Sequence, residues 1–410
     1  MARLTPFRAL RPSAAVAARV SSVPYDVVST AEARAAADGE PLSFLRVTRS
    51  EIELADGADP YATDVYDRAR TNLERLKADG VLATDAEPGL YLYRLTMGDH
   101  VQTGVAGGFS VDEYDRDRIR KHEKTRRDKE DDRTRHIVTL RAQTGVVFLT
   151  YRASRAIDEA VARATAGAPL YDFVAADGVG HALWRAGDAE RDALVDGFAV
   201  LPDLYIADGH HRAASAARAR VDVAAGRAPH PPASGAGDPA TFLAVAFPDD
   251  QVQVLPYHRV VKDLGGRDAG ALLAELERRF RFVDDAPQPS EPGRVSVYLD
   301  GRWRTLELAA APGESPIARL DCQRLQDQVL SPLLGIGDPR TDQRIDFVGG
   351  IRGTDELERR VDSGRAAIAF AMFPVTVAEL FAVADAGEIM PPKSTWFEPK
   401  LRDGLLIHEI

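Results

Sequence analysis

The sequence predicts a mixed α/β protein (α+β) made of two lobes. Helical and strand-like periodicities alternate along its 410 residues without a regular strand–helix–strand series. Segment 226–240, rich in proline, glycine and small residues, interrupts this pattern and cannot bury enough apolar surface to order itself. We therefore expect a first lobe over 1–225, a flexible loop or linker over 226–240, and a second lobe over 241–410 whose C-terminal tail returns to a functional site.

The first lobe is expected to combine a hairpin-like strand pair with several helices. Residues 61–82 have helical apolar spacing, and strands 91–95 and 101–109 flank the polar turn Met97-Gly98-Asp99. The other expected elements are strands over 145–151 and 204–207 and helices over 155–166, 188–197 and 210–226.

The second lobe is expected to begin with a strand over 242–247. Further elements follow without any internal repeat: a strand over 295–299, helices near 268–280 and 376–386, and an extended tail.

Composition excludes several classes of protein. A formal net charge of −11 argues against a general nucleic-acid binder. The single cysteine, Cys322, excludes a disulfide framework and a multi-cysteine metal site. The longest apolar run, 366–373, is far shorter than the ~18–20 residues needed to cross a bilayer. Because the N-terminus also lacks a secretory apolar region, we expect a cytoplasmic protein with no membrane or nucleic-acid partner.

The clearest candidate site is segment 205–212, Tyr-Ile-Ala-Asp-Gly-His-His-Arg. An apolar strand ends at Asp208, Gly209 permits a tight turn, and a helix follows at once. The unpaired N–H groups of that helix favour an anion, and Arg212 adds a fork suited to phosphate or carboxylate. The two histidines of the turn can be ligands, donors or proton carriers near neutral pH. A plain helix start would also fit, because aspartate is a favoured N-cap.

A second candidate is the charged block 115–135, in which 17 of 21 residues carry charge and the net charge is +3. It contains three of the seven lysines among the 52 basic residues: Lys121, Lys124 and Lys129. Phosphoryl transfer needs such cations to neutralise phosphate oxygens. A solvated helix with i,i+4 ion pairs would explain the block equally well.

The tail 390–400 is a third candidate. Two prolines stiffen it, and Lys393, Ser394 and Thr395 offer a charge and two hydroxyls. A docked terminal strand is the alternative interpretation.

Common catalytic motifs are missing. The sequence has no G-x-x-x-x-G-K-[ST], no G-x-G-x-x-G and no G-x-S-x-G. Segment 122–126 begins like the zinc motif H-E-x-x-H, but Arg126 occupies the second ligand position and would repel zinc.

Together these motifs resemble a large prokaryotic family long catalogued as a domain of unknown function, some members of which are free L-serine kinases that use inorganic pyrophosphate. The likeness covers nearly the whole chain. The motifs that carry it are Pro24-Tyr25-Asp26-Val27, Ser43-Phe44-Leu45, His122-Glu123-Lys124-Thr125, Lys129-Glu130, Asp132-Arg133, Ala207-Asp208-Gly209-His210-His211-Arg212, Pro256-Tyr257-His258-Arg259, Met390-Pro391-Pro392-Lys393-Ser394-Thr395 and Pro399-Lys400.

The Asp-Gly-His-His-Arg turn is also similar to a turn in ADP-dependent serine kinases, which share a fold with sulfiredoxin and the N-terminal domain of ParB. The resemblance therefore implies a ParB/sulfiredoxin-like element around this turn.

The resemblance implies phosphoryl transfer from a small polyphosphate to the hydroxyl of free L-serine, which gives O-phosphoserine. Asp208 is the candidate general base, and Mg²⁺ is the expected cofactor, held by Glu123 or Asp26. The other expected site residues are His210 and His211 in catalysis; Lys121, His122, Lys124, Thr125, Arg133 and Arg212 on phosphate; and Lys393, Ser394 and Thr395 closing the site from the tail.

Two other functions remain open from the residues. A metal-assisted phosphatase or hydrolase could use the same turn with water in place of serine. A ParB-like nucleotide- or nucleic-acid-binding module would need an extended basic face, which a net charge of −11 disfavours. The expected partners are small molecules, L-serine and pyrophosphate, with ADP and ATP as other donors; the sequence assigns no oligomeric state.

Overall fold

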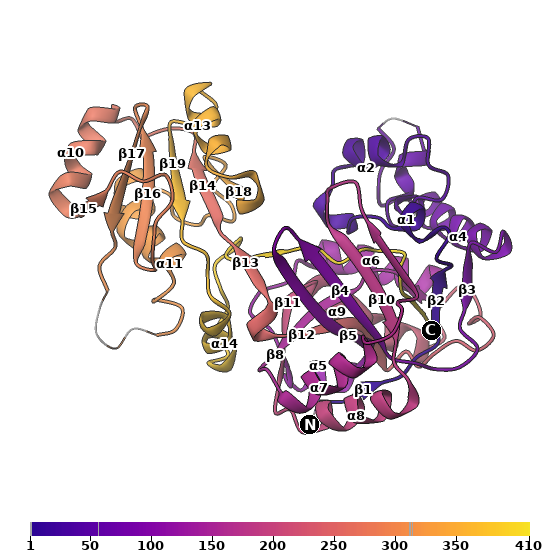
Figure 1. Ribbon diagram of the computed structural model, residues 1–410. Helices are drawn as coiled ribbons and strands as arrows, with labels where there is room; N and C mark the ends of the chain where they lie inside the picture. The colour runs from indigo at the N-terminus through magenta and orange to yellow at the C-terminus, as the bar shows by residue number, and fades with distance from the viewer. Residues whose placement is uncertain (1, 56, 311–312, 314) are drawn as a thin grey trace. The chain divides into compact units, whose positions relative to one another are not determined.

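The computed structural model divides the chain into two compact units (Figure 1). Unit 1 comprises Met1–Val252 and Pro399–Ile410, and unit 2 comprises Gln253–Glu398. The structure describes residues 2–55, 57–310, 313 and 315–410. Several sheets and many helices confirm the mixed α/β class.

The unit boundaries differ from the expected lobes. Strand β12 (Thr241–Pro248), assigned from the sequence to the second lobe, lies in the large sheet of unit 1 between β5 and β8. All its residues are buried, so the strand needs neighbours on both sides. Segment 226–240 is consequently a loop within unit 1, where the Gly237 amide donates to the Glu409 carbonyl at 2.7 Å. The compositional break marks a loop, not the boundary between units.

The large sheet of unit 1 has the strand order β6-β11-β8-β12-β5-β4-β10-β9, and β1 adds to β5. The sheet is mainly antiparallel, but β6–β11 and β8–β12 are parallel pairs. The expected hairpin is confirmed: β4 (Tyr91–Met97) pairs antiparallel with β5 (His100–Ser110). The other bounds are β1 (Leu4–Thr5), β6 (Ile119–Arg120), β8 (Val147–Tyr151), β9 (Tyr171–Val174), β10 (Gly180–Arg185) and β11 (Leu204–Asp208).

Helices pack on this sheet through a buried apolar cluster that includes Val147, Leu149, Phe198, Ile206 and Phe242. The expected helices are confirmed with small shifts of their ends. They are α4 (Thr63–Ala78), α7 (Arg155–Ala164), α8 (Asp188–Ala199) and α9 (His210–Ala224). The further helices of unit 1 are α1 (Ala17–Val20), η1 (Tyr25–Val27), α2 (Thr30–Ala37), α3 (Leu45–Thr48), η2 (Ser50–Glu53), α5 (Val111–Asp115), α6 (Arg127–Leu140) and η3 (Asp249–Gln251).

A small sheet contains strands from both the N-terminal and the C-terminal segments of unit 1. Its strand order is β3-β2-β21-β7. Its strands are β2 (Ala9–Pro12), β3 (Leu82–Thr84), β7 (Ala142–Gln143) and β21 (Ile407–Glu409). The C-terminal segment therefore completes unit 1.

Unit 2 contains a six-stranded antiparallel sheet in the order β15-β17-β16-β19-β14-β18. Helix α13 packs against β19 and β16 (Figure 1). A separate ribbon pairs β13 (Gln253–Leu255) with β20 (Trp396–Glu398). The other bounds are β14 (Tyr257–Val261), α10 (Ala269–Arg279), β15 (Arg281–Asp284), β16 (Arg294–Leu299), β17 (Arg302–Glu307), α11 (Asp321–Leu325), η4 (Gln326–Leu330), α12 (Ser331–Leu334), β18 (Ile345–Gly349), η5 (Gly350–Arg352), α13 (Asp355–Asp362), β19 (Ile368–Met372) and α14 (Val377–Asp385).

Helices long and apolar enough to cross a membrane do not occur in the described part of the chain.

Candidate functional site

The large sheet of unit 1 brings together two of the candidate segments, the charged block and the turn of segment 205–212. Strand β6 pairs in parallel with β11, with Ile119 opposite Leu204 and Arg120 opposite Tyr205. Parallel neighbours end at the same edge of a sheet, so loop 121–126 after β6 and turn 208–212 after β11 emerge side by side. Two hydrogen bonds join them: the Arg126 amide donates to His211 Nε2 at 2.9 Å, and the His122 amide to His210 Nε2 at 3.4 Å.

The backbone at the end of β11 directs the Asp208 side chain out of the sheet. The register of β11 against β8 shifts between Ile206 and Asp208, and such bulges redirect the side chain that follows. Gly209 then adopts φ +91°, a conformation that side chains disfavour. Helix α9 begins immediately, with no side-chain cap, so its first N–H groups lack helical partners.

Asp208 forms an ion pair with a residue from the C-terminal segment. Lys400 Nζ lies 2.8 Å from Asp208 Oδ2, and the Gly209 amide donates to Oδ1 at 2.7 Å. Burial raises the pKa of Asp208, but the charges of Lys400 and Arg212 and these hydrogen bonds outweigh it, so the pKa lies well below its usual range. Asp208 is therefore ionised at neutral pH.

His122 and His210 pack together beneath the turn. Both are at least 96% buried, and their rings meet edge to face with centroids 4.5 Å apart. Burial lowers the pKa of His122 to about 4 and that of His210 well below its usual range. Both rings are therefore neutral near pH 7.

The hydrogen bonds fix which nitrogen carries the proton in the two histidines of the turn. His210 and His211 each accept a backbone amide at Nε2, so the proton of each neutral ring lies on Nδ1. His210 Nδ1 lies 3.8 Å from Glu123 Oε2. Burial also lowers the pKa of His211, although Asp26 and Glu130 oppose this shift.

Arg212 is held from two directions. Its Nη1 donates to the Val146 carbonyl at 2.8 Å, and its Nη2 lies 2.7 Å and 2.9 Å from the two carboxylate oxygens of Asp26. Its guanidinium and that of Arg133 both lie over the Tyr25 ring, 5.7 Å and 4.2 Å from its centroid. Arg133 is in turn bound to Asp132 at 2.9 Å. Both arginines are thus held in place by neighbouring protein groups.

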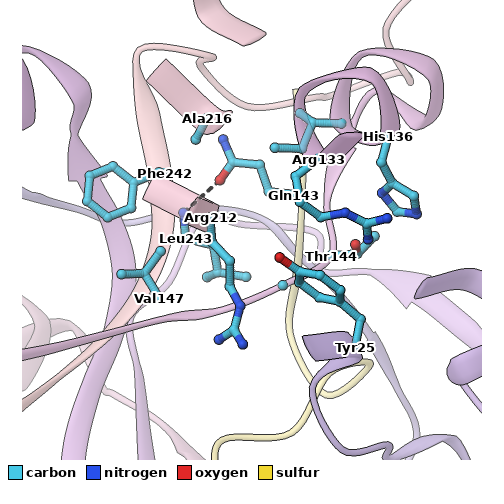
Figure 2. A pocket seen from close by; sticks show the side chains of 12 residues that line it. Tyr25, Arg133, His136, Gln143, Thr144, Val147, Arg212, Ala216, Phe242 and Leu243 are labelled. Carbon is cyan, nitrogen blue, oxygen red and sulfur yellow. Dashed lines mark hydrogen bonds between the residues drawn. The ribbon is translucent and has the colours of Figure 1, made fainter. Parts of the chain in front are cut away.

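The cavity drawn in Figure 2 lies on the inner side of this cluster. It is lined by Tyr25, Arg133 and Arg212, among others, and the Leu243 amide donates to Gln143 Oε1 at 2.7 Å in its wall. Its volume of about 20 Å³ is enough for roughly one water molecule, but not for a substrate.

The outer side of the cluster is open to solvent. The side chains of Asp208, Asp26 and Glu123 retain 28%, 37% and 46% of their exposure. A substrate that reaches Asp208 must therefore approach from this face.

The cationic side chains of the charged block differ in whether protein groups already bind them. Lys121 Nζ donates to the Tyr114 carbonyl at 2.9 Å and lies 2.7 Å from Asp117 Oδ1, so its charge is already paired. Lys124 is exposed and makes no hydrogen bond or ion pair within the described ranges. The Thr125 hydroxyl donates to Glu130. Among the expected phosphate ligands of this loop, Lys124 is the one that stays accessible.

The described residues contain no group of three or more histidine, cysteine or acidic side chains placed to hold a metal. Asp26 is bound to Arg212, so it is a poor candidate. Glu123 is exposed beside His210. Mg²⁺ usually takes one or two carboxylates and completes its shell with other oxygen ligands, so a metal held by Glu123 stays a prediction.

The three expected tail residues lie in unit 2. Ser394 is buried there: its hydroxyl donates to the Pro391 carbonyl at 2.7 Å and contacts Cys322 Sγ at 3.3 Å. Lys393 Nζ lies 5.4 Å from the centroid of the Tyr257 ring. The role of Lys393, Ser394 and Thr395 in closing the site stays a prediction.

Two residues at the site were not among those expected from the sequence. Lys400 pairs with Asp208. The sequence did contain a sign of its importance, because Lys400 is one of only seven lysines and belongs to the Pro399-Lys400 motif. Asp403 is 1% exposed, and its backbone pairs with Ser22. Burial raises its pKa to about 7, against the lowering effect of Arg212. No local sequence signal marks Asp403.

Solved structures that are similar to this chain include three of low sequence identity. The first, "Free serine kinase in complex with AMP", is 13% identical, covers 74% of this chain and 91% of its own, and has a TM-score of 0.35. A conserved hypothetical protein from Pyrococcus furiosus is 13% identical, with coverages of 74% and 94% and a TM-score of 0.33. C-terminally truncated SbnI from Staphylococcus aureus is 12% identical, with coverages of 74% and 87% and a TM-score of 0.34. At this level of similarity we take no chemistry from them.

No curated protein matches the chain. A family model does: that of "Protein of unknown function (DUF1015)" matches residues 4–323. That range includes loop 121–126 and turn 208–212. The family resemblance noted in the sequence is thereby confirmed, and the chain belongs to the DUF1015 family of proteins of unknown function.

Proposed function

We propose that this protein is a small-molecule phosphotransferase that moves a phosphoryl group from pyrophosphate, or from a nucleotide, to the hydroxyl of free L-serine. The observation that carries the proposal is the convergence of loop 121–126 and turn 208–212 at one sheet edge. This edge offers an ionised carboxylate, uncapped helix N–H groups and an accessible lysine on one exposed face.

In the proposed reaction the serine Oγ attacks the terminal phosphorus of the donor. A new P–O bond forms to serine, the bond from phosphorus to the bridging oxygen breaks, and that oxygen leaves with the remaining phosphate. The serine hydroxyl proton passes to the Asp208 carboxylate. The low pKa of Asp208 makes it a weak base. A loose phosphoryl-transfer transition state needs little base strength, so Asp208 would act mainly by orienting the hydroxyl.

Donor phosphates would be bound at the start of α9. Its free N–H groups and dipole favour an anion, and His211 can add its Nδ1–H. Lys124 would supply a mobile positive charge from the facing loop. Mg²⁺ bound with the donor would neutralise phosphate oxygens, with Glu123 as its protein ligand. Arg212 is already bound to Asp26 and Val146, so it would stabilise the turn and contribute its charge.

The direct test is an assay of the purified protein with L-serine and Mg²⁺ against pyrophosphate, ADP and ATP in parallel. We expect O-phosphoserine with at least one donor. Release of phosphate at the same rate without serine would favour the hydrolase alternative. Absence of both products with all three donors would contradict the proposal.

A second test replaces the proposed base. We expect Asp208→Asn to lower kcat by about 10²–10⁴-fold, the usual contribution of a positioned general base. Asp99→Asn is the matched control, because Asp99 is an exposed carboxylate in the β4–β5 turn of the same unit. Circular dichroism should show both variants folded. Unchanged turnover in Asp208→Asn would remove this residue from the mechanism.

A further inference from the structure

Unit 2 contains a basic pocket that is separate from the proposed active site. All of its lining residues except Val260 and Lys262 lie beyond the residues matched by the family model. Its volume is about 370 Å³, within the range of ~300–1,000 Å³ usual for small-molecule sites. Its lining residues come from β14 and the residue after it, the edge strand β18, η5, α13 and the turn that follows α13.

The lining of this pocket is almost entirely charged. The cations are Lys262, Arg352, Arg359, Arg360 and Arg365, and the anions are Asp346 and Glu356. The formal charge of the lining is therefore +3, in a chain whose net charge is −11. A concentration of positive charge in a hollow attracts small anions and raises their local concentration.

The two carboxylates are used to fix two of the arginines. Glu356 contacts Arg359 at 2.8 Å and Arg360 at 2.7 Å, and Arg360 also lies 2.8 Å from Asp346. These pairs hold the guanidinium groups in defined positions, while leaving N–H donors available for a further acceptor.

The other three cations of the pocket have no counter-charge among the residues that the structure describes. Lys262 Nζ donates to the Gln343 carbonyl at 2.7 Å, its single partner in that part of the chain. Arg352 and Arg365 make no side-chain hydrogen bond or ion pair within the described ranges. The backbone keeps two of them close, because the Ala367 amide donates to the Val261 carbonyl at 2.8 Å, which joins the turn of Arg365 to the strand end that carries Lys262.

The composition of the lining also restricts the ligand. Val260 is the single apolar residue among the described residues of the pocket, and no aromatic ring lines it. A nucleobase would find no stacking surface there. Three unpaired cations instead fit a ligand with several negative charges close together, and planar guanidinium groups suit phosphate oxygens.

We propose that this pocket is a second ligand site of the protein, which binds a small, multiply charged phosphate anion of the inorganic polyphosphate class. The site lies in unit 2, outside the catalytic cluster, and its existence does not depend on the activity proposed for unit 1.

The test is isothermal titration of the full chain with inorganic pyrophosphate in the absence of serine. The informative variant is Arg352→Gln/Arg365→Gln, which removes two unpaired charges. The matched control is Arg302→Gln/Arg340→Gln, which removes two exposed arginines of the same unit outside the pocket. Circular dichroism melts should show both variants folded.

We expect the pocket variant to lose one bound pyrophosphate per chain, or to bind it at least tenfold more weakly, while the control binds like the wild type. We also expect sulfate, with fewer charges, to bind at least tenfold more weakly than pyrophosphate. Identical pyrophosphate isotherms for the wild type and the pocket variant would overturn the proposal. Equal affinity for sulfate would overturn the assignment to polyphosphates.

Serine kinase assays on the same variants separate this inference from the proposed function. Loss of a pyrophosphate site in a protein without kinase activity would support the pocket and contradict the phosphotransferase. Full activity in the pocket variant, together with the lost binding, would place the two sites in different units.

Discussion

Asp208 is the residue on which the proposed chemistry depends, and Lys400 controls its charge. A carboxylate removed from water is normally protonated more easily. Here Lys400 at 2.8 Å and the nearby Arg212 reverse that tendency. The ion pair thus keeps the carboxylate ionised and fixes its direction before any substrate binds.

Removing the Lys400 charge should make Asp208 easier to protonate. We expect Lys400→Met to move the acid limb of the kcat/KM profile to higher pH by about 1–3 units, the usual effect of one adjacent cation. Lys400→Arg keeps the charge and should leave the limb close to its wild-type position. A pH–rate profile that is superimposable for all three proteins would show that Lys400 does not act through Asp208.

Gly209 is a second residue with a specific requirement, since φ is +91° at the start of α9. An added Cβ would also lie 3.3 Å from Arg212 Cδ and 3.4 Å from the Val147 Cα. We expect Gly209→Ala to lower the free energy of unfolding by about 1–3 kcal/mol through backbone strain. Urea denaturation measures this, with Gly167→Ala as the control, because Gly167 has open space around its Cα and no positive φ. A variant as stable as the wild type would contradict this account.

At the scale of elements, the sequence predicted the helices, strands and turns that are specified by neighbouring residues along the chain. Strand β11, the turn and α9 were expected nearly at their observed ends, because apolar runs, a glycine and strong helix formers specify each boundary. Periodicity could not reveal that β6, with only two residues, pairs with β11 and brings loop 121–126 to the turn. Such non-local pairing depends on the whole sheet.

Helix α6 shows the same limit. Its residues are mostly charged, which is typical of a solvated helix. The structure instead buries Asp132, Thr134 and His136, because α6 packs against both α4 and α9. Tyr66 compensates for the burial of Asp132 by donating its hydroxyl at 2.8 Å. Charge density alone therefore did not indicate exposure.

Strand β21 should be essential to unit 1, because it lies between β2 and β7 and Ile407 is fully buried in an apolar cluster. We expect Ile407→Ala to cost about 2–5 kcal/mol, the usual cost of such a truncation in a core. Val174→Ala on β9, where the side chain is 70% exposed, should change stability by less than about 0.5 kcal/mol. Equal urea midpoints for the two variants would show that the C-terminal strand is dispensable.

At the scale of the whole molecule, buried histidines determine the response to acid. Burial lowers the pKa of several of them from 6.5 to about 3 or 4: His122, His136, His181, His258 and His408. Each histidine is buried in its neutral form, so its contribution to the free energy of unfolding is complete above pH 6.5. This contribution is lost as the pH falls toward 4, because protonation favours the unfolded state. Asp403 acts in the opposite direction. Its pKa is raised from 3.8 to about 7, so its contribution is present below pH 3.8 and is lost as the pH rises to 7.

Burial also raises the pKa of Asp321, to about 6. Because the five histidines outnumber these two aspartates, the protein should lose stability on acidification. We expect Tm to fall steadily between pH 6.5 and pH 4, with a shallower fall in His136→Gln, which removes one titrating group. Thermal melts at constant ionic strength measure both slopes. A Tm that is constant or rises over this interval would contradict the assignment of neutral buried histidines.

The return of residues 399–410 to unit 1 has a consequence for biosynthesis. The ribosome reaches Lys400 and β21 only after it has translated all of unit 2, so the earlier part of unit 1 emerges without the strand that completes its small sheet. Unit 2, in contrast, is contiguous in the sequence. Any nascent chain that stops before residue 399 lacks both the partner of Asp208 and this strand, so truncated products would lack the Lys400–Asp208 ion pair and the complete small sheet.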